Sequence, residues 1–434
     1  MYKRQIFDGY IGVLIVAFII SLFATPIMRR LAVANGVIDR PSEARKVHRM
    51  PIAYLGGVAV YLGILAGVFY SYLGVRIEGL VQWHATKAEH LNAYGVPFTV
   101  PISIMLGLTV IMLVGVIDDV SGISPRVKIG GQFIAAAALA IDNVGVKMAQ
   151  GLLVPLAKAV GLPITMMSDG YESILWNIPL PMPIAGMDHI PIDFIYWIGT
   201  ALIALAVLGL CNASNLIDGL DGLLSGTTAI AAIGLLVVSL GLALIDDGPR
   251  DSQRIVLCLA LLGACLGFLP HNFNPATIFL GDAGSLMMGF CTCAIIMTLG
   301  DTGKTFLVAA GLIIYAVPII DTSLAIVRRK MEGKSISSAD DQHLHHMLKR
   351  ALGVKGAVLA LYGIAASFAL LGASITLLKA RVIYVLTLIL ASFIGVTAIK
   401  IARKKAIEAQ AAAYDAKGAT ATVPSPQNAE QKQS

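Results

Sequence analysis

Charged side chains are scarce in this sequence. Asp, Glu, Lys and Arg together make up 13% of its 434 residues, whereas soluble proteins carry about 25%. Apolar residues reach 57%. A chain this poor in charge is not expected to be soluble, and its composition indicates several membrane-spanning helices.

Two nucleotide-binding motifs and a metal-binding cysteine pattern are also missing. The sequence contains no G-x-x-x-x-G-K-[ST] and no G-x-G-x-x-G, which argues against an ATPase and a dinucleotide enzyme. The net charge of +6 favours anionic partners, although nucleic acid is not expected. The five cysteines lie in apolar surroundings, and we expect small buried side chains at Cys211, Cys258, Cys265, Cys291 and Cys293.

Eleven apolar stretches are candidates for spanning helices, which need about 20 residues each. We therefore expect an all-α polytopic membrane protein in which residues 1–405 form one transmembrane domain. The tail at 406–434 is rich in Ala, Gln, Thr, Pro and Ser and is expected to be disordered. The candidate stretches are 9–28, 54–73, 98–117, 129–146, 193–212, 223–245, 254–271, 284–299, 305–327, 356–377 and 382–402.

Basic residues predict the orientation of these helices. With the N-terminus outside, most of the 32 Lys and Arg residues fall in cytoplasmic connections and in a cytoplasmic C-terminal tail, as the positive-inside rule requires. The long connection at 147–192 then lies outside. Its proline-rich segment "IPLPMPIAGMDHIPI" predicts a short strand pair or an interfacial loop. This connection could also serve contacts in a homodimer.

Four polar motifs fall on the predicted cytoplasmic side, together with the basic loop "DRPSEARKVHRMPIAYLGG" at 39–57. Neither hydrophobicity nor the distribution of Lys and Arg uses the acidic residues, so their clustering is an independent sign of function. The motifs are "IDDVSGISPRVKIGGQ" (117–132), "NASNLIDGLDG" (212–222), "HNFNPATIFLGDAGS" (271–285) and "DDQHLHHMLKR" (340–350).

Each acidic motif also has an ordinary structural explanation. Asp118 and Asp119 could form a solvated helix end, or they could bind a cation, either Lys128 or a divalent metal. Asp218 and Asp221 could mark a capping turn, or a broken helix whose backbone N–H groups hold an anion.

The other two motifs leave similar choices. Asp282 lies where aspartate is an ordinary helix N-cap, and Phe279 could pack in the core or stack on a planar base. His343, His345 and His346 could form a zinc site, a phosphate-binding group or a solvated loop. No cysteine or fourth ligand joins them, so phosphate binding fits their basic surroundings better.

Together the motifs place acids, histidines and lysines around one membrane face. Carboxylate oxygens suit Mg²⁺, which bridges substrate phosphates, and basic side chains bind the same phosphates. The pattern therefore predicts phosphoryl transfer at a membrane face, with a lipid as one substrate.

In order and residue type, the motifs resemble those of the polyprenyl-phosphate N-acetylhexosamine-1-phosphate transferases. Between about residues 36 and 350 the sequence carries "RKVH…P…GG", "DD", "NLIDGLDG", "NPA…FLGDAGS" and "HLHH". The resemblance implies a multi-pass enzyme of the bacterial cytoplasmic membrane that depends on Mg²⁺ (or Mn²⁺). Such an enzyme transfers a sugar-1-phosphate from a UDP-sugar to a polyprenyl phosphate and releases UMP.

The histidine motif separates two branches of this family. "HLHHMLKR" is similar to the branch that transfers N-acetylglucosamine-1-phosphate and starts O-antigen (lipopolysaccharide), teichoic acid or related cell-envelope glycans. The phospho-N-acetylmuramoyl-pentapeptide transferases, with an unbroken HHH run, are the alternative. Two alternatives come from other classes of protein. A non-catalytic membrane scaffold would leave the motifs unexplained. A secondary transporter or ion channel would place its ionisable residues near the bilayer midplane.

The resemblance also implies roles for single residues. Asp282 is similar to the main Mg²⁺-binding aspartate, and Asp119 to a residue that supports the metal and the phosphates. Asp118 would deprotonate or position the lipid phosphate, and Asp218 would act near the nucleotide. The three histidines would hold the diphosphate or the sugar. The other substrate-binding residues implied are Lys46, Lys128, Asn212, Asn215, Asp221, Asn272 and Phe279, the last by stacking on uracil.

Overall fold

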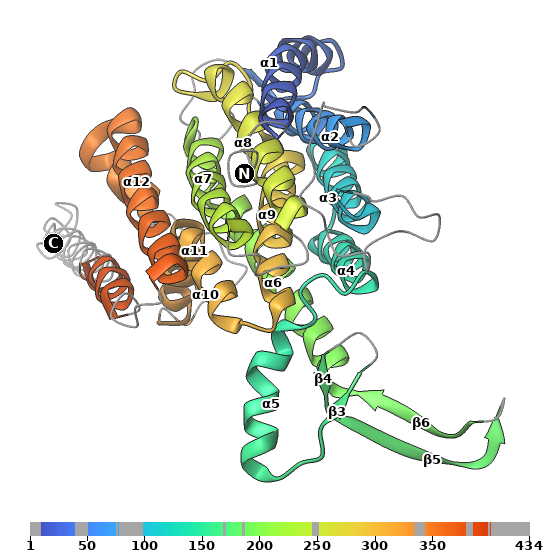
Figure 1. Ribbon diagram of the computed structural model, residues 1–434. Coiled ribbons are helices and arrows are strands. Elements are labelled where there is room, and N and C mark those ends of the chain that lie inside the picture. Colours follow the sequence, from blue (N-terminus) through green and yellow to red (C-terminus); the bar gives the residue numbers. More distant parts are fainter. Residues whose placement is uncertain are drawn as a thin grey trace, which may run out of the picture.

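The computed structural model describes most of the chain between the first span and the last. The described residues are 10–39, 51–74, 77, 99–167, 171–184, 187–244, 251–331, 333, 335, 343–378, 385–397 and 400. The predicted tail at 406–434 and Lys46 lie outside them. The described part is predominantly helical (Figure 1).

All eleven apolar stretches of the sequence coincide with described helices. The last stretch corresponds to a short helix at Val385–Thr397. The others correspond to α1 (Ile11–Ala34), α2 (Gly56–Gly74), α3 (Ile102–Ser121), α4 (Pro125–Ile141), α6 (Phe194–Ile217), α7 (Leu223–Leu244), α8 (Asp251–Asn272), α9 (Gly281–Leu299), α10 (Thr305–Ile314) with α11 (Ala316–Met331), and α12 (Leu344–Leu378).

Fewer of the described helices have the length and composition of a span than there are apolar stretches. Eight described helices are long and apolar enough to cross a membrane, or nine if α10 and α11 form one span bent by 82°. α4 has 17 residues, and Val385–Thr397 is also short. The chain is therefore a multi-pass membrane protein, but the predicted count of eleven spans is not confirmed.

α9 lies at the centre of the bundle, and nearly all of its residues are buried (Figure 1). Glycines let α2 and α3 approach its first turn. A Cβ atom at Gly57 would lie 2.1 Å from Gly284 N, and one at Gly115 would lie 2.3 Å from Ala283 Cα. Larger residues would force these helices apart, so the glycines hold the end of α3 against the start of α9.

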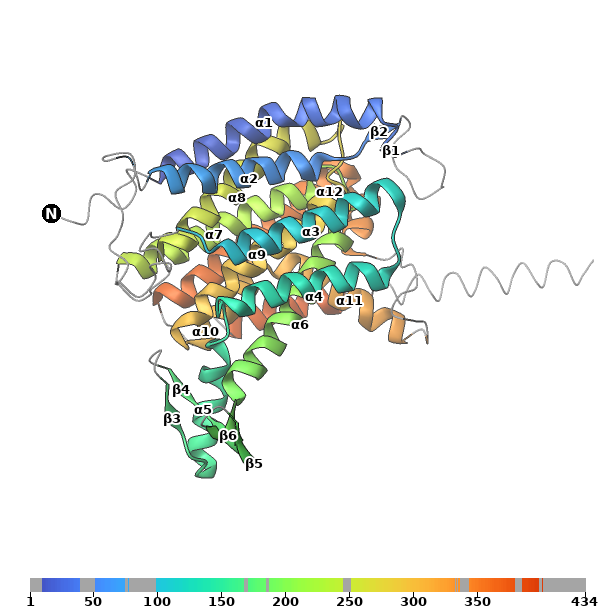
Figure 2. The same ribbon diagram turned by 90° about the vertical axis from the view of Figure 1, so that its right-hand side faces the viewer.

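A small lobe projects from one end of the bundle at the start of α6 (Figure 1 and Figure 2). It contains α5 (Met148–Val160) and two antiparallel strand pairs, so the fold is not strictly all-α. β3 (Thr165–Met166) pairs with β4 (Glu172–Ser173), and β5 (Leu175–Ile184) pairs with β6 (Met187–Asp193). The β5–β6 pair confirms the strand pair predicted within 147–192. α5 was not predicted, because Pro155 lies inside it.

α6 connects this lobe to the polar motifs. Its 24 residues correspond to a length of about 36 Å. It begins beside β6 and ends at Ile217, directly before Asp218. The polar motifs and the lobe therefore lie at opposite ends of this helix.

Candidate active site

Helix ends bring the polar motifs together. Asp118 and Asp119 lie at the end of α3, Lys128 lies in the first turn of α4, and Asp282 lies in the first turn of α9. Lys128 and Asp282 are 154 residues apart in sequence and in contact in space. The tertiary fold thus joins motifs that the sequence places on one membrane side.

Lys128 bridges two carboxylates. Its Nζ lies 2.6 Å from Asp118 Oδ2 and 2.5 Å from Asp282 Oδ2. The other oxygen of Asp118 accepts a hydrogen bond from Ile123 N at 2.8 Å, which fixes the carboxylate plane. All three charged side chains are partly exposed. The site therefore holds a positive charge between two carboxylates, within reach of a soluble ligand.

Asp119 caps the central helix from a different helix. Its Oδ1 accepts from Asp282 N at 2.8 Å, and its Oδ2 accepts from Ala283 N at 3.1 Å. These N–H groups belong to the first turn of α9 and have no partner within that helix. Asp119 thereby fixes the backbone that carries Asp282.

One of the three predicted asparagines contacts Asp282. Asn215 Nδ2 donates to Asp282 Oδ1 and to Ser285 Oγ, both at 2.9 Å. Asn212 instead donates to Gln132 Oε1 at 2.9 Å. Asn215 therefore orients the predicted metal ligand, whereas Asn212 links α6 to α4.

The turn after α6 carries the next two acids. Burial and the negative charges of Asp282, Asp119 and Asp221 raise the pKa of Asp218 to about 8. Asp221 Oδ2 accepts from Asn274 Nδ2 at 2.8 Å and from Ala276 N at 3.0 Å. The surroundings of Asp218 therefore favour its protonated form, while Asp221 binds the loop before α9.

Asn272 forms hydrogen bonds to the end of the same turn and to the start of α7. Its Oδ1 accepts from Gly222 N at 3.2 Å and from Ser225 Oγ at 2.9 Å, and its Nδ2 donates to Ile278 O at 3.1 Å. The side chain is buried. Its polar atoms are thus used to join two loops, and it fits a structural role beside the substrate rather than a direct contact.

Phe279 lies in a short backbone ladder beside the site. Its N–H donates to Ala53 O at 2.8 Å, and its carbonyl accepts from Gly56 N at 3.0 Å. The half-buried ring lies 6.1 Å from the ring of Tyr54, centroid to centroid. The backbone of Phe279 is therefore fixed, and the residue is partly exposed.

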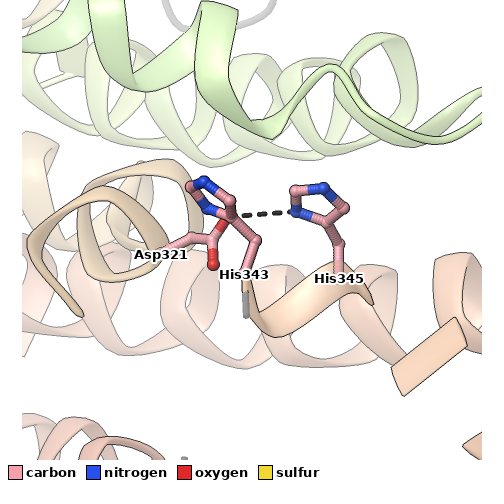
Figure 3. Close-up of side chains that lie close together, drawn as sticks. All are labelled: Asp321, His343 and His345. Carbon is pink, nitrogen blue, oxygen red and sulfur yellow. Dashed lines mark hydrogen bonds and ion pairs between the residues drawn. The ribbon is translucent and has the colours of Figure 1, made fainter. Parts of the chain in front are cut away.

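The histidine motif is organised by an acid that the sequence analysis did not select. Asp321 on α11 is buried, and its Oδ2 lies 3.0 Å from His343 Nδ1 and 3.1 Å from His345 Nδ1 (Figure 3). Its Oδ1 accepts from Leu344 N at 2.6 Å. The signal was present in the sequence, because Asp321 is an acid inside an apolar stretch.

The histidines also reach the turn after α6. A Cβ atom at Gly219 would lie 2.6 Å from His345 Nε2, so this nitrogen faces the turn that carries Asp218. The His346 ring lies 4.3 Å from the His345 ring and extends the group. The four motifs of the sequence therefore form two adjoining parts of one site.

The residues around Lys128 fit a divalent cation. Asp118 and Asp282 each direct one oxygen at the same cation, the ammonium group of Lys128. Carboxylate oxygens of this kind suit Mg²⁺. Asp119 fits a supporting role better, because both of its oxygens accept backbone hydrogen bonds.

Comparison with known proteins gives consistent matches. Residues 101–300 match the model of glycosyl transferase family 4. The chain is 31% identical to a probable undecaprenyl-phosphate N-acetylglucosaminyl 1-phosphate transferase of Bacillus subtilis, over 80% of this chain and 81% of that protein. It is 33% identical to a decaprenyl-phosphate N-acetylglucosaminephosphotransferase of Mycolicibacterium smegmatis, over 76% and 73%. A phospho-N-acetylmuramoyl-pentapeptide-transferase of Bacillus cytotoxicus is 28% identical, over 77% and 87%.

Proposed function

Since this chain belongs to glycosyl transferase family 4, we propose that it transfers N-acetylglucosamine-1-phosphate from UDP-N-acetylglucosamine to a membrane polyprenyl phosphate and releases UMP. The observation that carries the proposal is the pair of carboxylates, Asp118 and Asp282, aimed at one cation. The names of the relatives with 31% and 33% identity support the choice of sugar and of lipid class.

In this reaction one phosphoanhydride bond breaks and another forms. An oxygen of the lipid phosphate attacks the phosphorus that carries the sugar, and UMP leaves with the electron pair of the broken P–O bond. The transferred group needs positioning and charge neutralisation more than covalent help from the protein. A site of fixed charges at helix ends supplies both.

Asp282 and Asp118 would hold Mg²⁺, or Mn²⁺, with Asp119 fixing the backbone of Asp282. When bound, the ion neutralises charge on the diphosphate. Asp118 positions the lipid phosphate in this proposal and is not needed as a base, because a phosphate with a second pKa of about 6 is mostly ionised at neutral pH. Lys128 binds the lipid phosphate as a point charge.

The donor would lie along the part of the site that is formed by the turn after α6 and the histidine motif. Phe279 offers a partly exposed ring for stacking on uracil. Asp218 and Asp221 flank the nucleotide, and His345, with its neighbours, binds the diphosphate from the opposite side. Lys46, which lies outside the described residues, completes the predicted nucleotide contacts.

We place this site on the cytoplasmic face of the bacterial inner membrane, with the N-terminus outside. The distribution of Lys and Arg supports that orientation. The positions of Asp118, Lys128 and Asp282 at helix ends favour an interfacial enzyme over a transporter, whose site would lie at the midplane. The product would start a lipid-linked cell-envelope glycan.

The test is a transfer assay with purified protein, polyprenyl phosphate, Mg²⁺ and UDP-N-acetylglucosamine labelled in the sugar. Label should enter the organic phase, and EDTA should prevent it. D282N should abolish transfer while its Oδ1 still accepts from Asn215. D301N is the matched control, because Asp301 is a buried acid at the other end of α9. Equal activity of D282N and D301N would contradict the proposal.

The muramoyl-pentapeptide reaction is a second candidate, favoured by the 28% identity to the Bacillus cytotoxicus protein. The same assay with labelled UDP-N-acetylmuramoyl-pentapeptide separates the two. Lipid labelling from this donor alone would move the chain to that branch.

A further inference from the structure

Asp321 is a buried carboxylate, and its polar contacts with described residues come from one short segment. It is 1% exposed. Its oxygens meet three groups at the start of α12, namely the ring nitrogens Nδ1 of His343 and His345 and the backbone N–H of Leu344. Asp321 itself belongs to α11, 22 residues earlier. This contact therefore anchors the histidine motif to another helix.

The contact determines which ring nitrogens carry protons. An ionised carboxylate only accepts hydrogen bonds, so an imidazole that bonds to it through Nδ1 must be protonated at Nδ1. Both rings bond to the same oxygen and stack, with centroids 5.2 Å apart and planes inclined by 24° (Figure 3). The Nε2 atom of each ring is left for a different partner.

For His345 the structure shows where Nε2 points. His345 Nε2 lies against Gly219, and a Cβ atom at Gly219 would be only 2.6 Å from this nitrogen. Gly219 follows Asp218 in the turn after α6. Among the described residues, the charged and titratable groups near the two histidines include Asp321 on α11 and His346 and Lys349 on α12. Lys349 in turn interacts with Asp221 on the turn after α6 and with Arg350.

A buried carboxylate favours a cationic partner. An imidazolium bonded to Asp321 through Nδ1 has an Nε2–H that can donate to an anion. A neutral imidazole with the same Nδ1–H would present a lone pair to that anion. A phosphate ligand and the Asp321 carboxylate therefore stabilise the same protonation state.

We propose that Asp321 is a positioning residue that holds His343 and His345 by Nδ1, so that Nε2–H of His345 donates to the diphosphate of the donor. This inference rests on the proposed function. Asp321 does not touch the substrate, and it acts through the two rings. The same three side chains are also close enough to bind a metal ion, which is the rival explanation of their arrangement.

The test uses the full-length protein labelled with ¹⁵N at its eight histidines. H343Q and H345Q assign the ring signals. Wild type should show Nδ1 protonated in both rings. In D321N the amide can still accept from Leu344 N, but its NH₂ group favours an unprotonated Nδ1, so both signals should change. D301N, which alters a buried acid far from the histidines, should leave them unchanged.

Kinetics supply the second measurement. D321N should lower kcat/KM for UDP-N-acetylglucosamine about 10- to 100-fold, as for other residues that orient a functional histidine. The KM for the polyprenyl phosphate should stay within about threefold, because the lipid phosphate is bound at Lys128 on the other part of the site.

The two possible failures are distinguishable. A wild-type protein that transfers from no UDP-sugar would contradict the proposed function. Transfer by wild type with identical histidine spectra in D321N would contradict the role of Asp321. One zinc ion per wild-type chain, lost in D321N, would also overturn it, because the three side chains would then be metal ligands.

Discussion

The Asp119 carboxylate, on α3, caps α9, the helix whose first turn carries Asp282. The two hydrogen bonds run to the backbone N–H groups of Asp282 and Ala283. A carboxylate at a helix N-terminus is stabilised by the free N–H groups and the helix dipole. The contact therefore links the stability of the bundle to the placement of the proposed metal ligand.

Replacing Asp119 should affect both properties. D119A should lower the free energy of unfolding by about 1–2 kcal/mol, the usual loss for a helix cap, and should also lower transfer. D119N keeps one accepting oxygen and should be destabilised less. Thermal unfolding in detergent, followed by circular dichroism, measures the difference. A D119A protein as stable and active as wild type would show that the cap has no such role.

Lys128 should compete with Mg²⁺ for the same two carboxylates. In wild type a bound ion must displace the ammonium from Asp118 and Asp282, whereas in K128M those oxygens are free and repel each other. Mg²⁺ should therefore raise the melting temperature more in K128M than in wild type, while transfer falls. K128R keeps the charge and is the control. An equal Mg²⁺ effect in all three proteins would argue against a shared site.

Mg²⁺ binding should depend on pH through Asp218. Its pKa is raised to about 8, so the carboxyl is protonated below that pH in the metal-free protein. A nearby cation favours the ionised form, and binding then releases the proton. The apparent Mg²⁺ affinity should rise with pH up to pH 8 and then level off. Titrations at several pH values measure this slope, which D218N should reduce, since one of the carboxyl groups that release a proton is then missing. An unchanged slope in D218N would assign it to other groups of the site.

Gly219 should be needed for the position of His345. The Cβ atom of G219A would lie 2.6 Å from His345 Nε2, so the ring must tilt away and weaken its contact with Asp321. The KM for UDP-N-acetylglucosamine should rise about tenfold, the cost of one charge-assisted hydrogen bond. G209A is a suitable control, because a Cβ atom at Gly209 on α6 meets no atom within 4 Å. Equal values for both variants would contradict the contact.

The positions of the helices could be predicted from the sequence because apolar stretches of spanning length are a strong local signal. That the polar motifs lie together could be predicted too, since the order of the helices places their ends. The bend between α10 and α11 could not, because both halves are apolar and only the 82° angle separates them. The predicted count of eleven spans is not confirmed, because α10 and α11 are bent and because α4 and Val385–Thr397 are short.

The contacts within the site could be predicted less well from the sequence. Gly57 and Gly115 let α2 and α3 pack closely against the start of α9, which carries Asp282. The sequence does not show which helix a glycine inside an apolar stretch faces. Asp321 was visible as an acid in an apolar stretch. Its partners were not, because the pairing with His343 and His345 depends on how α11 packs against α12.

The central claim is that the sugar and its phosphate are transferred together. The most direct measurement uses UDP-N-acetylglucosamine carrying ³²P in the phosphate next to the sugar, with wild type and D282N in parallel. Wild type should move ³²P into the lipid fraction together with the sugar and release unlabelled UMP, and D282N should do neither. Sugar in the lipid fraction with ³²P left in water-soluble UDP would contradict the claim, because the bond broken would then be the glycosidic bond.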